Sequence, residues 1–194
     1  MPASLGDVSW PLRTARLLIR AADAADAASV HRYRRLPEVA EWMTSLADDA
    51  EVFTTQFCEP ERLGRTLVVE RAGEVVGDLM LRIEDAWGQT EVAEVAAGAQ
   101  AEIGWAFDPA VHGQGLASEA ARRLLELAFQ DLGLRRVYAV AFAANERSWR
   151  LMERLGMRGE GSFVADSLHR SRGWLDSVGY ALLRDEWVAR PPVG

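Results

Sequence analysis

The sequence predicts a single domain, residues 1–194, of mixed α/β (α+β) class. Apolar and polar residues alternate over 66–85, as they do in half-buried strands. The segment 135–143 is almost continuously apolar, which is typical of a buried central strand. Between these segments, apolar residues after Gly115 recur at the spacing of a helix. Strands and helices that alternate in this way indicate a sheet covered by helices.

Composition narrows the class of partner. The 194 residues, 49% of them hydrophobic, are enough for one substantial core. A net charge of −7 and a pI near 5.1 argue against a nucleic-acid partner, because such binding depends on a basic surface. No apolar run approaches the roughly 20 residues of a membrane helix, and no signal-peptide pattern opens the chain. We therefore expect a cytoplasmic protein with no membrane partner, and the single Cys58 fits that compartment.

The first third of the chain predicts one strand followed by helices. A strand is expected at 15–22, and then a helix at 23–36 with Asp23 or Asp26 as its cap. The polar stretch 44–65 is expected to form a further helix and a loop. The inward face of the first helix is expected to carry Ala27, Val30 and either Tyr33 or Leu36.

The middle of the chain predicts a hairpin. Two strands, 66–71 and 74–85, are joined by a turn in which Gly73 takes a positive φ. After a loop at 87–100, a third strand is expected at 101–107.

The last third predicts alternating elements. We expect a helix that ends at Gly133, a buried strand at 135–143, a helix at 145–157, two strands around 171–173 and a short terminal helix. The expected order is therefore strand, helices, three strands, helix, strand, helix and two strands.

Gly113 and Gly115 stand between the third strand and the helix that follows it. A P-loop would need a lysine here, and none is present. A dinucleotide fingerprint would need glycine or alanine where Ser118 stands. A third interpretation is that backbone N–H groups at the helix start hold a pyrophosphate. The spacing alone leaves this interpretation open beside a simple strand-to-helix turn.

Four segments carry a family resemblance. "AEIGWAFDPAVHGQGLASEA" resembles the strand, loop and helix of the acetyl-CoA site in the GNAT N-acetyltransferase superfamily. In the same order along the chain, "LRTARLLIRAADAADA", "AANERSWRLMERLGMRGEG" and "WLDSVGYALLRDEW" resemble segments of its RimJ/RimL-like branch, the ribosomal-protein-alanine N-acetyltransferases. His112 departs from the usual Gln or Arg of the loop signature, and Met157 replaces the usual Phe.

The resemblance implies a fold and a cofactor. It implies a mixed, mostly antiparallel sheet of about six to seven strands, splayed at its centre and flanked by helices, which binds acetyl-CoA and no metal. Backbone groups of the splayed strand would face the pantetheine arm and the reacting carbonyl oxygen, and the loop would hold the pyrophosphate. The cofactor-binding residues that it implies are Trp105, Ala106, Phe107, His112, Gly113, Gln114, Gly115, Leu116, Ala117, Asn145 and Ser148.

Acetyl transfer to an amine needs a base, because an ordinary amine is mostly protonated at neutral pH. Glu102 is the leading candidate, since it lies in the strand that enters the loop and alternates with Ile103. An outward, solvated carboxylate explains Glu102 equally well. Glu94 and Asp176 are weaker candidates, and Asp176 is expected to accept hydrogen bonds from a neighbouring loop.

The resemblance implies three further roles. Ser148 would donate a proton to the leaving thiolate, and Asn145 would bond the pantetheine, although local helix capping explains both residues. Trp42, Met43 and Phe53 are candidates for the acceptor pocket, with core packing as the alternative.

The resemblance therefore implies an acyl-CoA-dependent N-acyltransferase. It would transfer acetyl from acetyl-CoA to a primary amine, a protein N-terminus or a small amine, by direct attack in a ternary complex without a covalent intermediate at Cys58. A larger acyl group such as succinyl stays open, and a homodimer is expected by analogy. The alternative function is a CoA-binding sensor or interaction protein with the same fold and little or no catalysis.

Overall fold

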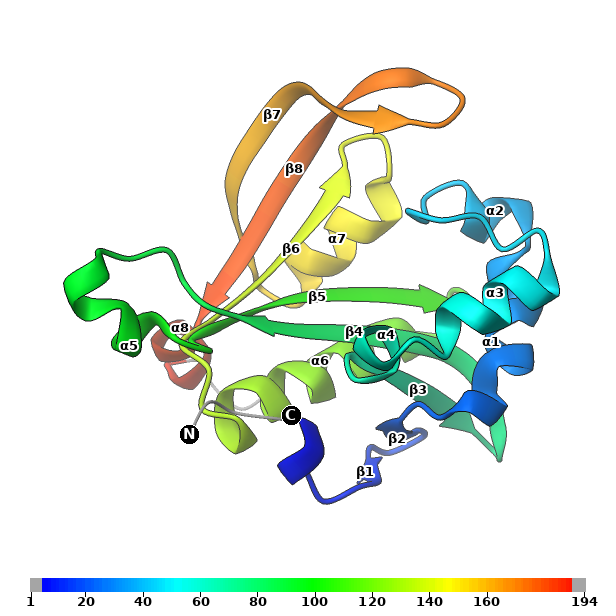
Figure 1. Ribbon diagram of the computed structural model, residues 1–194, viewed down its shortest axis with the longest axis horizontal. Helices are drawn as coiled ribbons and strands as arrows, with labels where there is room; N and C mark the ends of the chain where they lie inside the picture. The colour runs from blue at the N-terminus through cyan, green and yellow to red at the C-terminus, as the bar shows by residue number, and fades with distance from the viewer. Residues whose placement is uncertain (1–4, 190–194) are drawn as a thin grey trace. The chain divides into compact units, whose positions relative to one another are not determined.

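The computed structural model describes residues 5–189 and contains one mostly antiparallel sheet flanked by helices (Figure 1). The strands are β1 (Leu12–Arg13), β2 (Leu18–Ala21), β3 (Thr66–Arg71), β4 (Glu74–Glu84), β5 (Gln100–Phe107), β6 (Arg136–Phe142), β7 (Arg158–His169) and β8 (Gly173–Leu183). The sheet has eight strands in the order β1-β2-β3-β4-β5-β6-β8-β7. This confirms the predicted class, with one strand more than the predicted order contained. The additional strand, β1, has two residues, too few to produce an alternating pattern.

The helices follow the predicted order with one exception. They are α1 (Ala27–Arg34), α2 (Pro37–Ala40), α3 (Ala50–Phe57), α4 (Pro60–Leu63), α5 (Ala93–Ala96), α6 (Leu116–Glu126), α7 (Glu146–Arg154) and α8 (Arg184–Val188). The exception is α5, which lies within residues 87–100, where a loop was predicted. The helix predicted to run to Gly133 is α6, which changes at Leu127–Asp131 into a short π-helix before Gly133 takes a φ of +67°. No helix in the part of the chain that the structure describes is long and apolar enough to cross a membrane.

The described chain forms two compact units. We name residues 5–82 and 103–124 the N-terminal unit, and residues 83–102 and 125–189 the C-terminal unit. Strands β4 and β5 and helix α6 begin in one unit and end in the other.

The core of the N-terminal unit lies between α1, α3 and the strands β3, β4 and β5. The predicted inward face of α1 is confirmed, because Ala27, Val30 and Tyr33 are buried and Leu36 packs against them. The β3–β4 hairpin also follows the prediction, since Gly73 has a φ of +85°. The buried members of this core are Ala27, Val30, Tyr33, Val39, Ala47, Phe53, Phe57, Val68, Val75 and Ala106.

A buried carboxylate ties α1 to β4 inside the N-terminal unit. Asp78 is 1% exposed. It accepts a hydrogen bond from the Tyr33 hydroxyl at 2.8 Å and another from Arg34 Nε at 2.9 Å, and it forms an ion pair with Arg34 Nη2. Burial alone would lower the pKa of Arg34, but the charge of Asp78, its hydrogen bonds to Arg34 and the nearby Tyr33 together raise that pKa. Burial, and then the negative charge of Asp78, raises the pKa of Tyr33 well above its ordinary value.

The C-terminal unit is built on β6, β7 and β8. β6 pairs with β8 in antiparallel register from Arg136↔Leu183 to Phe142↔Ser177, and β7 and β8 form a long hairpin (Figure 1). α7 buries Leu151 and Met152 and ends before Gly156, which has a φ of +72° as a helix terminator. The indole N–H of Trp149 donates to the Ala143 carbonyl at 3.0 Å.

Asp78→Ala tests how strongly the buried carboxylate stabilises the N-terminal unit. We expect the free energy of unfolding to fall by about 3–5 kcal/mol, because the variant leaves the Arg34 charge buried without its partner. Tyr33→Phe removes one hydrogen bond and keeps the ion pair, so it should cost about 1–2 kcal/mol. Urea denaturation measures both variants. If the free energy of unfolding fell equally in the two variants, the ion pair would contribute nothing to stability.

Candidate functional site

The loop between β5 and α6 presents a row of backbone donors. Gly113 and Gly115 have φ of +74° and +75°, a backbone conformation that residues other than glycine rarely adopt. Within residues 5–189, no hydrogen bond of good geometry runs from the N–H groups of Gly113–Ser118 to another group of the chain, and the first bond of α6 runs from the Glu119 N–H to the Gly115 carbonyl at 3.0 Å. We name the N–H groups of Gly113–Ser118 the amide row. It can bind an anion, because these donors stand at the positive end of the helix dipole.

Side chains from distant segments hold this loop. Arg16 Nη1 donates to the Gln114 carbonyl at 2.9 Å, and Arg71 Nη1 donates to Gln114 Oε1 at 2.6 Å. His112 is exposed, and its Nε2 lies 3.2 Å from the Phe107 carbonyl. Arg16 and Arg71 lie far from this loop in the sequence, so no local pattern predicted their contacts with it.

Glu119, in the first turn of α6, fixes Arg16. Its carboxylate accepts bonds from the Thr14 hydroxyl at 2.6 Å, the Arg16 N–H at 3.0 Å and Arg16 Nε at 2.7 Å. Burial alone would raise the pKa of Glu119, but the bonds from Thr14 and Arg16 lower it below its ordinary value. Glu119 therefore stays charged at neutral pH and keeps Arg16 in place beside the loop.

The strand before the loop is closely packed. Ala106 and Phe107 are buried and Trp105 is half-buried. A Cβ atom at Gly77 would lie 2.5 Å from the Phe107 ring, so only glycine fits there. The splay predicted for this strand stays a prediction.

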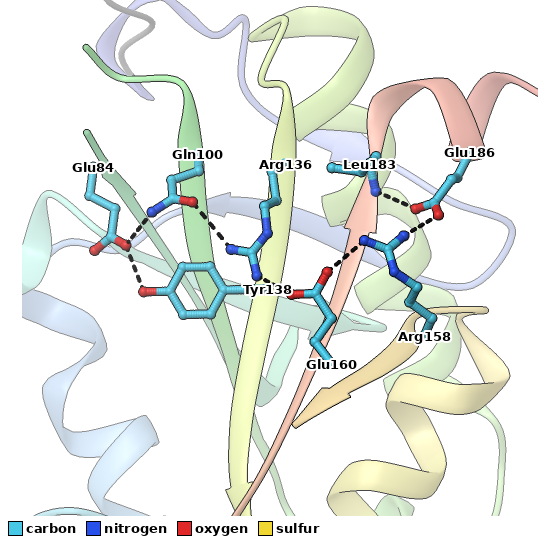
Figure 2. A network of polar contacts seen from close by, with 8 residues as sticks. All are labelled: Glu84, Gln100, Arg136, Tyr138, Arg158, Glu160, Leu183 and Glu186. Atoms are coloured by element: carbon cyan, nitrogen blue, oxygen red, sulfur yellow. Dashed lines mark hydrogen bonds and ion pairs between the residues drawn. The ribbon is translucent and has the colours of Figure 1, made fainter. Parts of the chain in front are cut away.

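Glu102 lies in the C-terminal unit beside a tyrosine. β5 and β6 run parallel over Gln100–Glu102, with Glu102 opposite Tyr138, so these two side chains project from the same face of the sheet. The Tyr138 hydroxyl donates to Glu84 Oε1 at 2.6 Å, and Gln100 Nε2 donates to the same oxygen at 3.1 Å (Figure 2). The structure thus places Tyr138 beside Glu102, and Tyr138 in turn bonds Glu84. No local sequence pattern predicted either residue, because their positions depend on which residues of the strands pair.

The polar contacts of Figure 2 continue across the C-terminal unit. Arg136 lies over the Tyr138 ring at 5.0 Å and donates to Gln100 Oε1 at 3.2 Å. It also pairs with Glu160, which pairs with Arg158. Burial alone would raise the pKa of Glu160, but Arg136 and Arg158 lower it. Arg158 also forms an ion pair with Glu186, at the start of α8. The Glu186 carboxylate accepts a hydrogen bond from the Leu183 N–H at 2.8 Å.

Asn145 and Ser148 lie at the start of α7. Asn145 is the N-cap, and its side-chain oxygen accepts the Ser148 N–H at 3.4 Å. The predicted capping contact is therefore present, and the predicted cofactor roles of both residues stay predictions.

Asp176 and Glu94 are the two further acidic candidates. Asp176 Oδ1 accepts the Ala165 N–H at 2.8 Å, so it has a structural hydrogen bond as expected, but the donor lies in strand β7 and not in a loop. Glu94 is exposed on α5.

The three candidates for an acceptor pocket lie in different environments. Phe53 is 2% exposed and packs against Phe57 and His31, so it occupies the core of the N-terminal unit, as the alternative interpretation expected. Met43 is partly buried against that core, and Trp42 is half-buried.

The comparisons with known proteins identify the family. A profile described as "Acetyltransferase (GNAT) domain" matches residues 16–158, which include both the amide row and Glu102. The chain belongs to the GNAT acetyltransferase family. This confirms the superfamily named by the resemblance, and the RimJ/RimL-like branch stays a proposal.

Individual relatives agree with the GNAT assignment. The chain is 41% identical to the uncharacterized N-acetyltransferase YnaD of Bacillus subtilis (strain 168) over 86 residues, 44% of this chain and 50% of YnaD. That match thus spans half the length of the relative. A GNAT-family acetyltransferase structure from Bacillus anthracis is 28% identical, with a TM-score of 0.73 over 91% of this chain and 100% of that one.

A third match shows the fold alone. The ribosomal-protein-S5-alanine acetyltransferase of Vibrio fischeri has a TM-score of 0.71 over 94% of this GNAT chain and 100% of its own, at 17% identity.

Asn145 variants separate capping from cofactor binding. Asn145→Ala should lower the free energy of unfolding by about 1 kcal/mol through loss of the cap. Asn145→Ser keeps a capping oxygen but has a shorter reach, so it should retain stability and weaken CoA binding. Denaturation and calorimetry measure the two effects. A serine variant with unchanged stability and unchanged CoA affinity would leave capping as the role of Asn145.

Proposed function

We propose that the whole chain, residues 1–194, is one acyl-CoA-dependent N-acyltransferase domain of the RimJ/RimL-like branch. The amide row is the observation that carries this proposal. A pyrophosphate offers several acceptor oxygens and negative charge, which match a run of N–H groups at a helix N-terminus. Because main-chain donors supply the match, His112 in place of Gln or Arg is compatible with it. Acetyl-CoA is the proposed cofactor, and when bound it supplies an activated acyl thioester.

The residues of the chain then have distinct tasks. Glu102 accepts a proton from the acceptor ammonium, directly or through water, so that the nitrogen can attack. Backbone N–H groups of Trp105–Phe107 stabilise the charge that develops on the carbonyl oxygen. Ser148 donates a proton to the departing thiolate, and Asn145 bonds the pantetheine. These roles rest on the family resemblance.

Trp42 and Met43 are the proposed acceptor contacts, with Phe53 supporting Met43 from the core. A primary amine is the proposed acceptor, either a protein N-terminus or a small amine. The Vibrio fischeri structure is that of a ribosomal-protein-S5-alanine acetyltransferase, and at 17% identity its likeness to this chain concerns the fold alone. The net charge of −7 favours cationic acceptors of either class. Acetyl is the proposed acyl group, and a homodimer is proposed by family analogy.

The alternative is a CoA-binding sensor or interaction protein with the same fold. The amide row supports this alternative equally, because it concerns binding and not chemistry. The capping contact of Asn145 with Ser148 also favours it, since it gives these two residues a structural reason to be present.

Glu102→Gln distinguishes the two proposals. For an enzyme, we expect kcat to fall about 10²- to 10⁴-fold, because a general base contributes that much, while the Kd for acetyl-CoA stays unchanged. Release of free thiol, measured with an N-terminal peptide, a polyamine and a small amino compound, reports kcat, and calorimetry reports Kd. Glu91→Gln, at an exposed position of the same unit with no proposed role, is the matched control and should leave both unchanged.

Two results would overturn the enzyme proposal. If acetyl-CoA and other short acyl-CoA thioesters fail to bind, the cofactor assignment is wrong. If they bind but no amine releases thiol, and Glu102→Gln changes nothing, the chain is the sensor.

A further inference from the structure

We propose that Arg71 and Gln114 form a clamp that sets the amide row in its binding conformation. Arg71 acts as a positioning residue, through Gln114, and not by touching the cofactor. This inference rests on the proposed function, since it concerns how the chain binds the pyrophosphate of CoA.

The clamp fixes both ends of Gln114. Arg71 Nη1 donates to its side-chain oxygen at 2.6 Å, and Arg16 Nη1 donates to its carbonyl oxygen at 2.9 Å. The side-chain nitrogen of Gln114 donates to the Ala110 carbonyl at a longer 3.4 Å. One residue of an exposed loop is thus held at its main chain and at both polar atoms of its side chain.

Gln114 needs this support because of its neighbours. Gly113 and Gly115 both have positive φ, and glycine has the largest backbone freedom of any residue. A loop with two such residues loses much conformational entropy when it orders around a ligand. Holding Gln114 before binding removes part of that cost, so the clamp should raise affinity by pre-organisation.

The two arginines differ in the charge that they leave near the loop. Arg16 is neutralised by Glu119, with a salt bridge of 2.7 Å. Arg71 bonds the neutral amide of Gln114, and no carboxylate pairs with it among residues 5–189. Arg71 could therefore also attract anions over a distance, so the test must separate charge from positioning.

A series of ligands with fewer and fewer phosphate groups separates the effect of charge from the effect of positioning. CoA and 3′-dephospho-CoA both contain the pyrophosphate, and only CoA contains the 3′-phosphate. Pantetheine contains no phosphate group. A clamp that acts on the amide row should affect CoA and 3′-dephospho-CoA equally and pantetheine not at all.

The variants are Gln114→Ala, Arg71→Gln and the double substitution, with Kd measured by calorimetry. We expect each single variant to raise the Kd for CoA and for 3′-dephospho-CoA about 5- to 10-fold, the cost of immobilising one or two side chains. The double variant should be no weaker than the weaker single variant, because both changes break one interaction. Gln114→Ala changes no charge, so an equal effect of the two singles excludes a purely electrostatic role of Arg71.

Two controls match the changes. Arg13→Gln removes one positive charge from the exposed face of β1, and Gln89→Ala removes an exposed glutamine side chain from the C-terminal unit. Both should leave every Kd within about twofold, since neither touches the loop. Thermal unfolding should give the same midpoint for all clamp variants, because the loop is exposed.

Four outcomes would overturn the clamp. If the two single effects multiply in the double variant, the residues act independently. If only CoA and not 3′-dephospho-CoA loses affinity, Arg71 contacts the 3′-phosphate directly. If the unsubstituted protein binds CoA and no variant changes Kd, the clamp is wrong while the proposed function stands. If the unsubstituted protein does not bind CoA, the proposed function itself fails and the clamp fails with it.

Discussion

The first turn of a helix always leaves backbone N–H groups without an acceptor inside the helix. The proposed binding function depends on these N–H groups at the start of α6. Many helices satisfy such groups with a capping side chain, as Asn145 does for α7. Before α6, two glycines with positive φ extend the row of unsatisfied donors backward from the helix into the loop. Several N–H groups at this place therefore lack an acceptor, and the oxygens of a pyrophosphate can supply one for each.

Other interactions stabilise the two units that contain this row and the candidate base. In the N-terminal unit, the Asp78 carboxylate joins α1 to β4, and Glu119 keeps Arg16 against the loop. In the C-terminal unit, the contacts of Figure 2 join Glu84, at the end of β4, through β5 and β6 to α8. Both sets use carboxylates bound by arginines, which hold a fixed geometry through several hydrogen bonds each.

The sequence predicted most of the fold and only part of the site. Periodicity located the hairpin 66–84 and the helix after Gly115, because local patterns determine such elements. It missed β1, which is too short to show a period, and the π-helix at 127–131, which continues the same apolar face. The amide row was foreseeable, since glycines next to a helix start are a local signal.

The contacts around the site depend on partners far apart in the chain. The bond between Arg71 and Gln114 joins positions 43 residues apart, and that between Tyr138 and Glu84 joins positions 54 residues apart. Strand register and loop packing bring these residues together, and neither leaves a local sequence pattern.

Nuclear magnetic resonance of the ¹⁵N-labelled chain during a CoA titration tests the central claim most directly. The amide resonances of Gly113–Ser118 should shift strongly, while that of Gly73, an exposed glycine of the same unit with similar φ, should not. Saturable CoA binding that leaves the resonances of the amide row in place would contradict the account.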